Sequence, residues 1–124
     1  MGFKNILLVG LGGAFGSITR YLGEKYFTQL YPQPFPIGTF LVNVLGCFLI
    51  GLFFGLASKN EYLTPAFRLL LMTGFCGGFT TFSAFTLEGI ELLHEQRFLI
   101  FTLYFVLSVL FGLIATFAGL WLTQ

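Results

Sequence analysis

Polar side chains at the centre of long apolar stretches are the residues of this sequence most able to do chemistry. Asn43 lies near the middle of one such stretch, and Thr39 lies one helical turn earlier on the same face. A carboxamide in hydrocarbon must find hydrogen-bond partners or water. Either an interhelical hydrogen bond or a position as a donor in a pore wall would satisfy Asn43. On a later stretch Tyr104 and Ser108 share a face at i, i+4 spacing, and Gly112 continues it.

Two phenylalanines add a different chemistry. Phe82 and Phe85 are three residues apart, so they face together on a helix, and Ser83 lies beside them. Aromatic stripes at helical spacing usually pack in a core. The edge of a phenyl ring is electropositive, however, and ring edges next to hydroxyl and amide donors would suit a small anion. Core packing and anion binding are both compatible with this pattern.

The stretch that carries these phenylalanines is interrupted at its centre. It covers residues 66–93, about 42 Å as a continuous helix, and residues 73–83 have the sequence TGFCGGFTTFS. Glycines and hydroxyl side chains together disfavour a helix. Irregular backbone at membrane depth persists only where it is buried in protein or lines a cavity. We predict a broken helix with its break at Gly77-Gly78, as in transport proteins with discontinuous helices; a flexible kink without a ligand is the alternative.

A few ionisable and sulfur-containing residues complete the candidate set. Arg20 ends the first apolar stretch, where it would snorkel to the interface or draw anions into a vestibule. Glu88 lies beyond the predicted break, and an acid at that depth is a functional hypothesis by default, here a pore-adjacent acid. Cys47 and Cys76 lie in apolar surroundings and are interpreted as small hydrophobes. With one histidine in the chain, the ligands for a side-chain metal site are too few.

These residues need elements that hold them in a membrane. Of the 124 residues, 56% are apolar and 9% are charged, whereas soluble domains carry roughly 25% charged residues. Four stretches, 5–22, 37–57, 66–93 and 99–122, approach the ~20 apolar residues that a spanning helix requires. We therefore predict an all-α membrane protein with a single four-helix domain over residues 1–124. A net charge of +1 without a basic cluster argues against nucleic acid as a partner.

The positive charges are divided equally between the two sides of the membrane. The side of the termini has Lys4, Lys59 and Arg68, and the other side has Arg20, Lys25 and Arg97. The positive-inside rule then gives no preferred orientation. Insertion in both orientations would permit an antiparallel homodimer, although so few charges can also balance by chance. A bundle of four helices is filled by its own side chains, so conduction would require an oligomer.

With these features in place, the sequence resembles a family of small bacterial fluoride channels, the Fluc or CrcB proteins. The resemblance covers nearly the whole chain. It rests on Gly12-Gly13 with Gly16 and Arg20, on Gly38-Thr39 with Val42-Asn43 and Gly46, and above all on Gly74 to Phe85 followed by Glu88. It implies an antiparallel, dual-topology homodimer in the inner (plasma) membrane, with two fluoride pores and a structural Na⁺ on the two-fold axis.

The resemblance also implies roles for individual residues. Those in the fluoride pore would be Asn43, Phe82, Ser83, Phe85, Tyr104 and Ser108. The main-chain carbonyls of Gly77 and Thr80 would bind the Na⁺. One departure is Gly112, because members of the family commonly have a hydroxyl residue there. Water or a neighbouring hydroxyl would have to take its place.

Two other classes of membrane protein share the length and the four spans. Small multidrug exporters need an acid inside the first span, whereas the first acid here, Glu24, follows the predicted end of that span. A non-transporting scaffold would use its polar residues only to join helices. Ion flux through liposomes distinguishes these classes. An enzyme is not predicted, because no nucleophile has a plausible base: the single histidine, His94, lies near a membrane surface.

Overall fold

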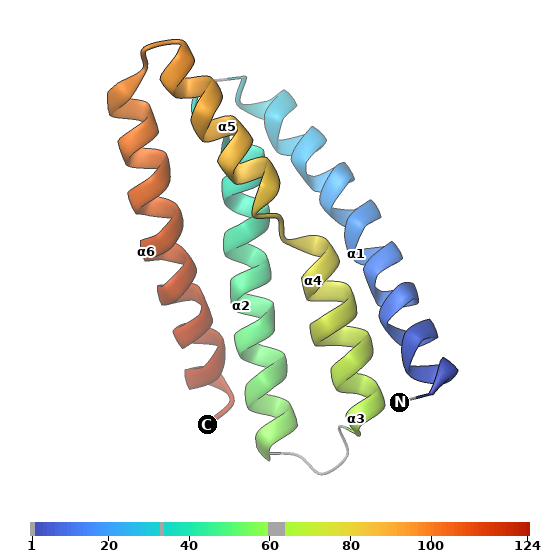
Figure 1. Cartoon of the computed structure of the whole chain (residues 1–124). Coiled ribbons are helices and arrows are strands. Elements are labelled where there is room, and N and C mark those ends of the chain that lie inside the picture. Colours follow the sequence, from blue (N-terminus) through green and yellow to red (C-terminus); the bar gives the residue numbers. More distant parts are fainter. Residues whose placement is uncertain (1, 33, 60–63) are drawn as a thin grey trace.

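The computed structural model of the chain describes residues 2–32, 34–59 and 64–124, and these ranges are helical apart from short connections (Figure 1). Four helical stretches are long and apolar enough to cross a membrane: Phe3–Leu30, Ile37–Lys59, Pro65–His94 and Phe98–Leu122. The prediction of four spans is therefore confirmed. Both termini lie at the same end of the bundle.

The first, second and last spans are single helices, α1 (Phe3–Leu30), α2 (Ile37–Lys59) and α6 (Phe98–Leu122). Helix α1 continues past Leu22, the predicted end, and stops just before Pro32, where a missing N–H and a clash with the preceding turn end a helix. Glu24 is therefore part of α1. The predicted second span ends at residue 57, before the polar run Ser58-Lys59-Asn60-Glu61, of which Asn60 and Glu61 lie outside the described residues.

The third span is built from four segments: α3 (Pro65–Phe67), η1 (Arg68–Cys76), α4 (Gly77–Phe79) and α5 (Ser83–His94). It begins with Thr64 extended and Pro65 at the first helical position, where proline is favoured, although the Thr64 hydroxyl makes no capping bond. Segment η1 is a π-helix, in which hydrogen bonds close over five residues; the N–H of Gly77 donates to the carbonyl of Met72.

The predicted break is present, but it lies at Thr80-Thr81 and not at Gly77-Gly78. Gly77 has helical angles, φ −61° and ψ −38°, whereas Thr80 is extended, with φ −93° and ψ 159°. Figure 1 shows the irregular connection between α4 and α5 near mid-height of the bundle. Neither glycine turns the chain, and Gly78 instead lets another helix approach it.

That close approach is between α1 and the first half of the third span. A Cβ added at Gly12 would lie 2.8 Å from the N of Phe75 and 2.9 Å from the Cα of Gly74. A Cβ at Gly78 would lie 2.6 Å from the carbonyl oxygen of Gly13. Backbone therefore packs directly on backbone, as the spacing of Gly12 and Gly16 predicts.

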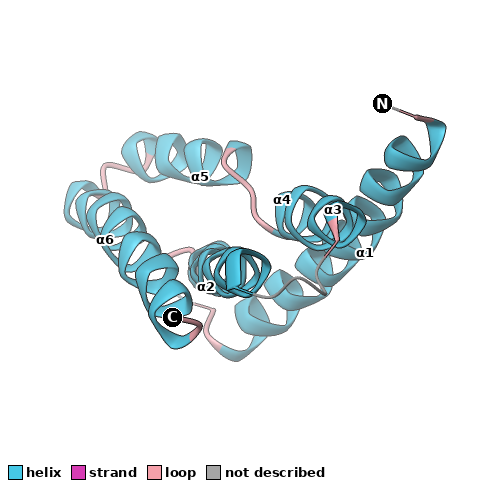
Figure 2. Ribbon diagram, turned by 90° about the horizontal axis from the view of Figure 1, so that it is seen from below, coloured by secondary structure: helices cyan, strands magenta, loops and turns pink. Residues whose placement is uncertain are grey.

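Helix α2 occupies the centre of the molecule. Seen from below, it lies between α6 on one side and the pair formed by α1 and α4 on the other (Figure 2). Its glycines pack on α6: a Cβ at Gly51 would lie 3.1 Å from the Cα of Thr116, and one at Gly55 would lie 2.8 Å from the Cβ of Thr123. Helices α2 and α6 therefore run parallel and in close contact along most of their length.

Candidate functional site

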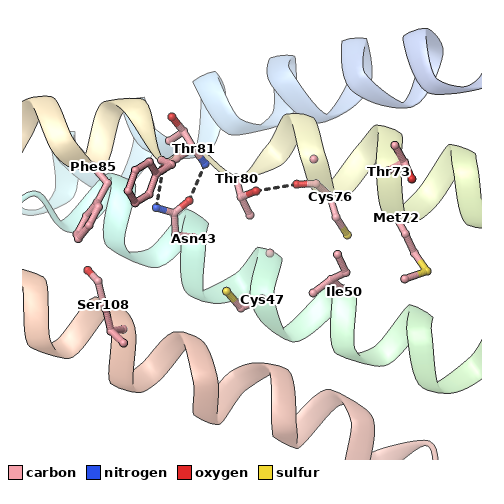
Figure 3. Close-up of a pocket in the computed structure, with 14 residues that line it drawn as sticks. Asn43, Cys47, Ile50, Met72, Thr73, Cys76, Thr80, Thr81, Phe85 and Ser108 are labelled. Atoms are coloured by element: carbon pink, nitrogen blue, oxygen red, sulfur yellow. Dashed lines mark hydrogen bonds between the residues drawn. The ribbon is translucent and has the colours of Figure 1, made fainter. Parts of the chain in front are cut away.

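The break in the third span is held open by the side chain of Asn43. Its Nδ2 donates to the carbonyl of Thr81 at 2.9 Å, and its Oδ1 accepts from the Thr81 N–H at 2.8 Å (Figure 3). One amide from α2 thus replaces two main-chain partners at the point where the helix stops. The interhelical role predicted for Asn43 is present, and one N–H of the amide remains for another acceptor.

The capping of the break releases two carbonyl groups. In a continuous helix the Gly77 carbonyl accepts from the N–H of Thr81, but that N–H donates to Asn43. The Thr80 carbonyl accepts from the N–H of Ala84, but that N–H donates to Oγ1 of Thr81 at 3.2 Å. Both carbonyls therefore lose their usual helical donors, and these are the two carbonyls predicted to bind a cation.

Arg20 binds the next carbonyl of the same turn. Its Nε donates to the Gly78 oxygen at 3.0 Å, reaching from α1 to the end of α4. A positive charge at a helix C-terminus is electrostatically favourable. Arg20 is half-buried and contacts the break, so it is not simply a residue that snorkels to the interface. Sequence analysis alone did not link it to the break.

A cavity of about 600 Å³ opens beside the break, between α2, the third span and α6. It brings together four of the predicted pore residues and both of the predicted carbonyl ligands, namely Asn43, Phe82, Phe85, Ser108, Gly77 and Thr80. Cys47 and Cys76 lie on its wall as well. Ser83 and Tyr104 lie outside this wall; the Ser83 hydroxyl is 3.5 Å from the Thr81 hydroxyl. We call this cavity the groove.

The two phenylalanines of the groove differ in their surroundings. Their ring centroids are 5.9 Å apart, so they face together as predicted. Phe85 is buried against Tyr104, with centroids 5.0 Å apart, whereas Phe82 exposes 77% of its surface in the single chain. A ring so exposed at the middle of a membrane span contacts lipid or another protein surface.

Ser108 has the least satisfied polar side chain of the groove. Its hydroxyl oxygen is buried, and no described residue forms a hydrogen bond with it. Native proteins rarely leave a buried hydroxyl without a partner, so a water or an ion is expected at this position. The nearby amide of Asn43 and the edges of the phenylalanine rings give that position a set of donors.

A second polar cluster lies past the break, on the side of α5. Both carboxylate oxygens of Glu88 accept hydrogen bonds at 3.0 Å, Oε2 from the Thr39 hydroxyl and Oε1 from the Tyr104 hydroxyl. Thr39 is 3% exposed and Tyr104 is 1% exposed. All three residues are candidates in the sequence. The contact between them was not predicted, because they belong to three different helices.

Comparison with known proteins gives a consistent result. A family model described as CrcB-like protein, Camphor Resistance (CrcB), matches residues 7–120. A protein of Flavobacterium psychrophilum named fluoride-specific ion channel FluC is 47% identical over 117 residues, which is 94% of each chain. Proteins of the same name are 46% identical in Gloeothece citriformis, over 96% of each chain, and 40% identical in Azobacteroides pseudotrichonymphae, over 98% of this chain and 97% of that one.

Proposed function

This chain belongs to the CrcB family, and from that premise we propose that it is a fluoride-selective channel through which F⁻ leaves the cell passively. Its relatives are named fluoride-specific ion channels, a class of membrane protein that is not enzymatic. The chain itself is a multi-pass membrane protein with four apolar helices.

The observation that carries the proposal is the buried Ser108 hydroxyl without a partner in the groove. Fluoride is small and strongly hydrated, so a narrow path must replace its water with hydrogen-bond donors. Ser108, the remaining N–H of Asn43, and the ring edges of Phe82 and Phe85 are donors of this kind. On the far side of the break, the hydroxyls of Thr39 and Tyr104 are already engaged with Glu88, which makes Glu88 a competitor for the donors that an arriving anion needs.

Ser83 and Arg20 have supporting positions in this path. Ser83 opens α5 directly after Phe82, and its hydroxyl faces that of Thr81 at 3.5 Å. The guanidinium of Arg20 holds a positive charge beside the break, where it would attract an anion from the vestibule. Both side chains carry groups that can donate hydrogen bonds to an anion, and neither adds a negative charge to the path.

We also propose that two copies of the chain assemble as an antiparallel dimer with two pores. The groove is open on the single chain, and Phe82 is 77% exposed at its rim. A second copy would cover both. The equal division of positive charge supports insertion in either orientation, and a two-fold axis would repeat any pore that lies away from it.

A structural Na⁺ would fit at the two-fold axis of such a dimer. The Gly77 and Thr80 carbonyls have lost their helical donors and line the open groove. Two from each subunit would give four hard oxygen ligands, which suit a hard cation. The bound ion would supply positive charge to converging carbonyl dipoles. The Thr80 hydroxyl donates to the Cys76 carbonyl at 2.9 Å. The main chain of Thr80 is the proposed ligand because its carbonyl has lost its helical donor.

Fluoride efflux from liposomes that contain the purified protein tests the function. We expect fast fluoride efflux once an ionophore lets the counter-ion leave as well, and no comparable efflux when the liposomes contain chloride instead of fluoride. Equal rates for the two ions, or no fluoride efflux from a folded protein, would contradict the proposal.

The assembly is tested separately with a cysteine tag at one terminus. In an antiparallel dimer, an impermeant thiol reagent labels about half of the tags from each side of the membrane. Labelling from one side alone excludes the antiparallel arrangement. Removing Na⁺ by dialysis should weaken the dimer in size-exclusion chromatography if the ion joins the subunits.

A further inference from the structure

Helices α2 and α6 each carry three residues at the same spacing on the sides that face each other, and all of them except Gly112 have polar side chains. On α2 the series is Thr39, Asn43 and Cys47, and on α6 it is Tyr104, Ser108 and Gly112, each at i, i+4 spacing. Because the helices run parallel, these residues form three successive levels. Thr39 and Tyr104 meet on Glu88, and Asn43 and Ser108 both line the groove. The third level pairs Cys47 with Gly112.

At this third level α6 contributes no side chain. Gly112 is buried, and a Cβ added to it would meet one neighbour within 4 Å, the Sγ of Cys47 at 3.4 Å. The thiol of α2 therefore takes the position toward which a side chain on α6 would point. In Figure 3 Cys47 lies along the same groove as Asn43 and Ser108.

We propose that the Cys47 thiol is the third polar level of the conduction path, in place of the side chain that α6 lacks at Gly112. The proposal rests on the fluoride-channel function proposed above. A thiol is a weak hydrogen-bond donor, and here it lies one helical turn from Asn43 on α2. On α6, Ser108 lies one turn from Gly112, and its buried hydroxyl has no partner among the described residues. An anion leaving Ser108 would meet the S–H of Cys47 next.

The main chain around Cys47 fixes the thiol in this place. The Thr116 hydroxyl donates to the Cys47 carbonyl at 3.1 Å and ties α2 to α6 at this level. Cys47 is half-buried, which leaves the sulfur in contact with the groove. The other free thiol, Cys76, is almost fully buried on η1 and lines the groove as well, so it is not a suitable control. The matched control is Thr102 on α6, whose exposed hydroxyl donates to the Phe98 carbonyl of its own helix at 2.9 Å and does not line the groove.

The test is a double-mutant cycle measured as fluoride efflux from liposomes. Cys47→Ala removes the donor and should slow efflux about fivefold. In Gly112→Ser alone the new Cβ would already be in van der Waals contact with the sulfur at 3.4 Å, so its hydroxyl would compete with the thiol for the same space and should bring no gain. In Cys47→Ala the same serine has room and supplies a hydroxyl from α6, so the double variant should recover most of the wild-type rate. The control Thr102→Ala also removes one polar side chain from α6, but outside the groove, and should conduct at the wild-type rate.

Rescue by Gly112→Ser is the outcome that a packing role for Cys47 would not produce. A double variant that is a folded dimer but no faster than Cys47→Ala would overturn the proposal, as would Cys47→Ala at the wild-type rate. If Cys47→Ala does not fold, Cys47→Ser decides, because it keeps a donor of similar size: a rate at or above wild type supports the proposal, and a slower rate refutes it. Absence of fluoride efflux from the wild-type protein would instead overturn the channel function itself.

Discussion

The first half of the third span has two unlike faces, and the adjacent residues Gly77 and Gly78 lie on different ones. Gly78 faces α1, where an added Cβ would lie 2.6 Å from the Gly13 carbonyl oxygen. Gly77 faces the groove, where an added Cβ would meet nothing closer than the Met72 carbonyl at 4.0 Å. The contact between Gly78 and the α1 backbone requires a residue without a side chain. At Gly77 the missing side chain leaves a space that no other part of the single chain fills.

The same residue type therefore has different surroundings on the two faces, with close backbone contact at Gly78 and open space at Gly77. The α1 face is closed by backbone contacts, so it tolerates no added atom. The groove face presents released carbonyls, a capping amide and exposed aromatic edges. Variants on the first face should affect folding, whereas variants on the second should affect assembly and conduction in a protein that still folds.

The largest effect is expected from the two glycines themselves. Gly78→Ala should destabilise the fold by about 3 kcal/mol, because the Gly13 backbone cannot move aside as a side chain could. Gly77→Ala should yield a normally folded chain that dimerises poorly. Thermal unfolding in detergent and size-exclusion chromatography measure the two effects. Gly10→Ala, which has nothing within 4 Å, is the control for α1. Equal stability of the Gly77 and Gly78 variants would remove the distinction between the faces.

Asn43→Ala comes next. It leaves both the N–H and the carbonyl of Thr81 without their partner, at a cost of about 2–4 kcal/mol at the break. We expect fluoride efflux to fall by about a hundredfold, since the break and the groove lose their shape together. Thr81→Ser is the control, because Asn43 binds only the main chain of Thr81. If Asn43→Ala conducts normally, the amide is not what holds the break.

The two groove phenylalanines give a smaller effect. Phe82→Ile and Phe85→Ile keep an apolar side chain but remove the electropositive ring edge. We expect a folded dimer with efflux slowed about tenfold, which corresponds to a barrier higher by about 1.4 kcal/mol. Phe117→Ile is the control, since Phe117 is 67% exposed on α6 and does not line the groove. Normal efflux in both groove variants would show that the rings only pack.

The smallest effect is expected for Thr80→Ser. The hydroxyl that donates to Cys76 is kept, and the main-chain carbonyl is unchanged. Only the methyl group is lost, which packs on Gly46, so the stability should drop by less than about 1 kcal/mol. Dimer stability measured with and without Na⁺ checks this. Because serine keeps the hydroxyl, a strong loss of Na⁺ dependence would mean that the Na⁺ site needs the packing of the Thr80 methyl group on Gly46 and not the main-chain carbonyl alone.

Hydropathy was sufficient to predict the four spans, because it depends on local composition. The position of the break was not predictable in the same way. It is set by Asn43, which lies on α2 and meets Thr81 across 38 positions of sequence. Without that partner, glycine was the natural candidate for the break, although Gly77 and Gly78 are both helical.

The candidate site was predicted residue by residue but not as a set of contacts. Thr39, Glu88 and Tyr104 were each notable as polar residues in apolar stretches, and only the tertiary packing of α2, α5 and α6 brings them together. The contact between Arg20 and the Gly78 carbonyl was also missed. Charge and depth suggested that Arg20 is interfacial, since no sequence pattern relates a residue of α1 to the end of α4.

The length of α1 gives the host membrane an influence on this protein. With 28 residues, α1 is about 42 Å long, whereas a hydrocarbon core is about 30 Å thick. Helix α2 is seen nearly along its axis in Figure 2, and α1 lies aslant beside it. A bilayer of longer acyl chains would let α1 stand more upright. Because Gly12 and Gly16 hold α1 to the half-helix that ends at the break, such a change of tilt would act on the break as well. The length of the lipid acyl chains would thereby change the geometry of the break without any ligand.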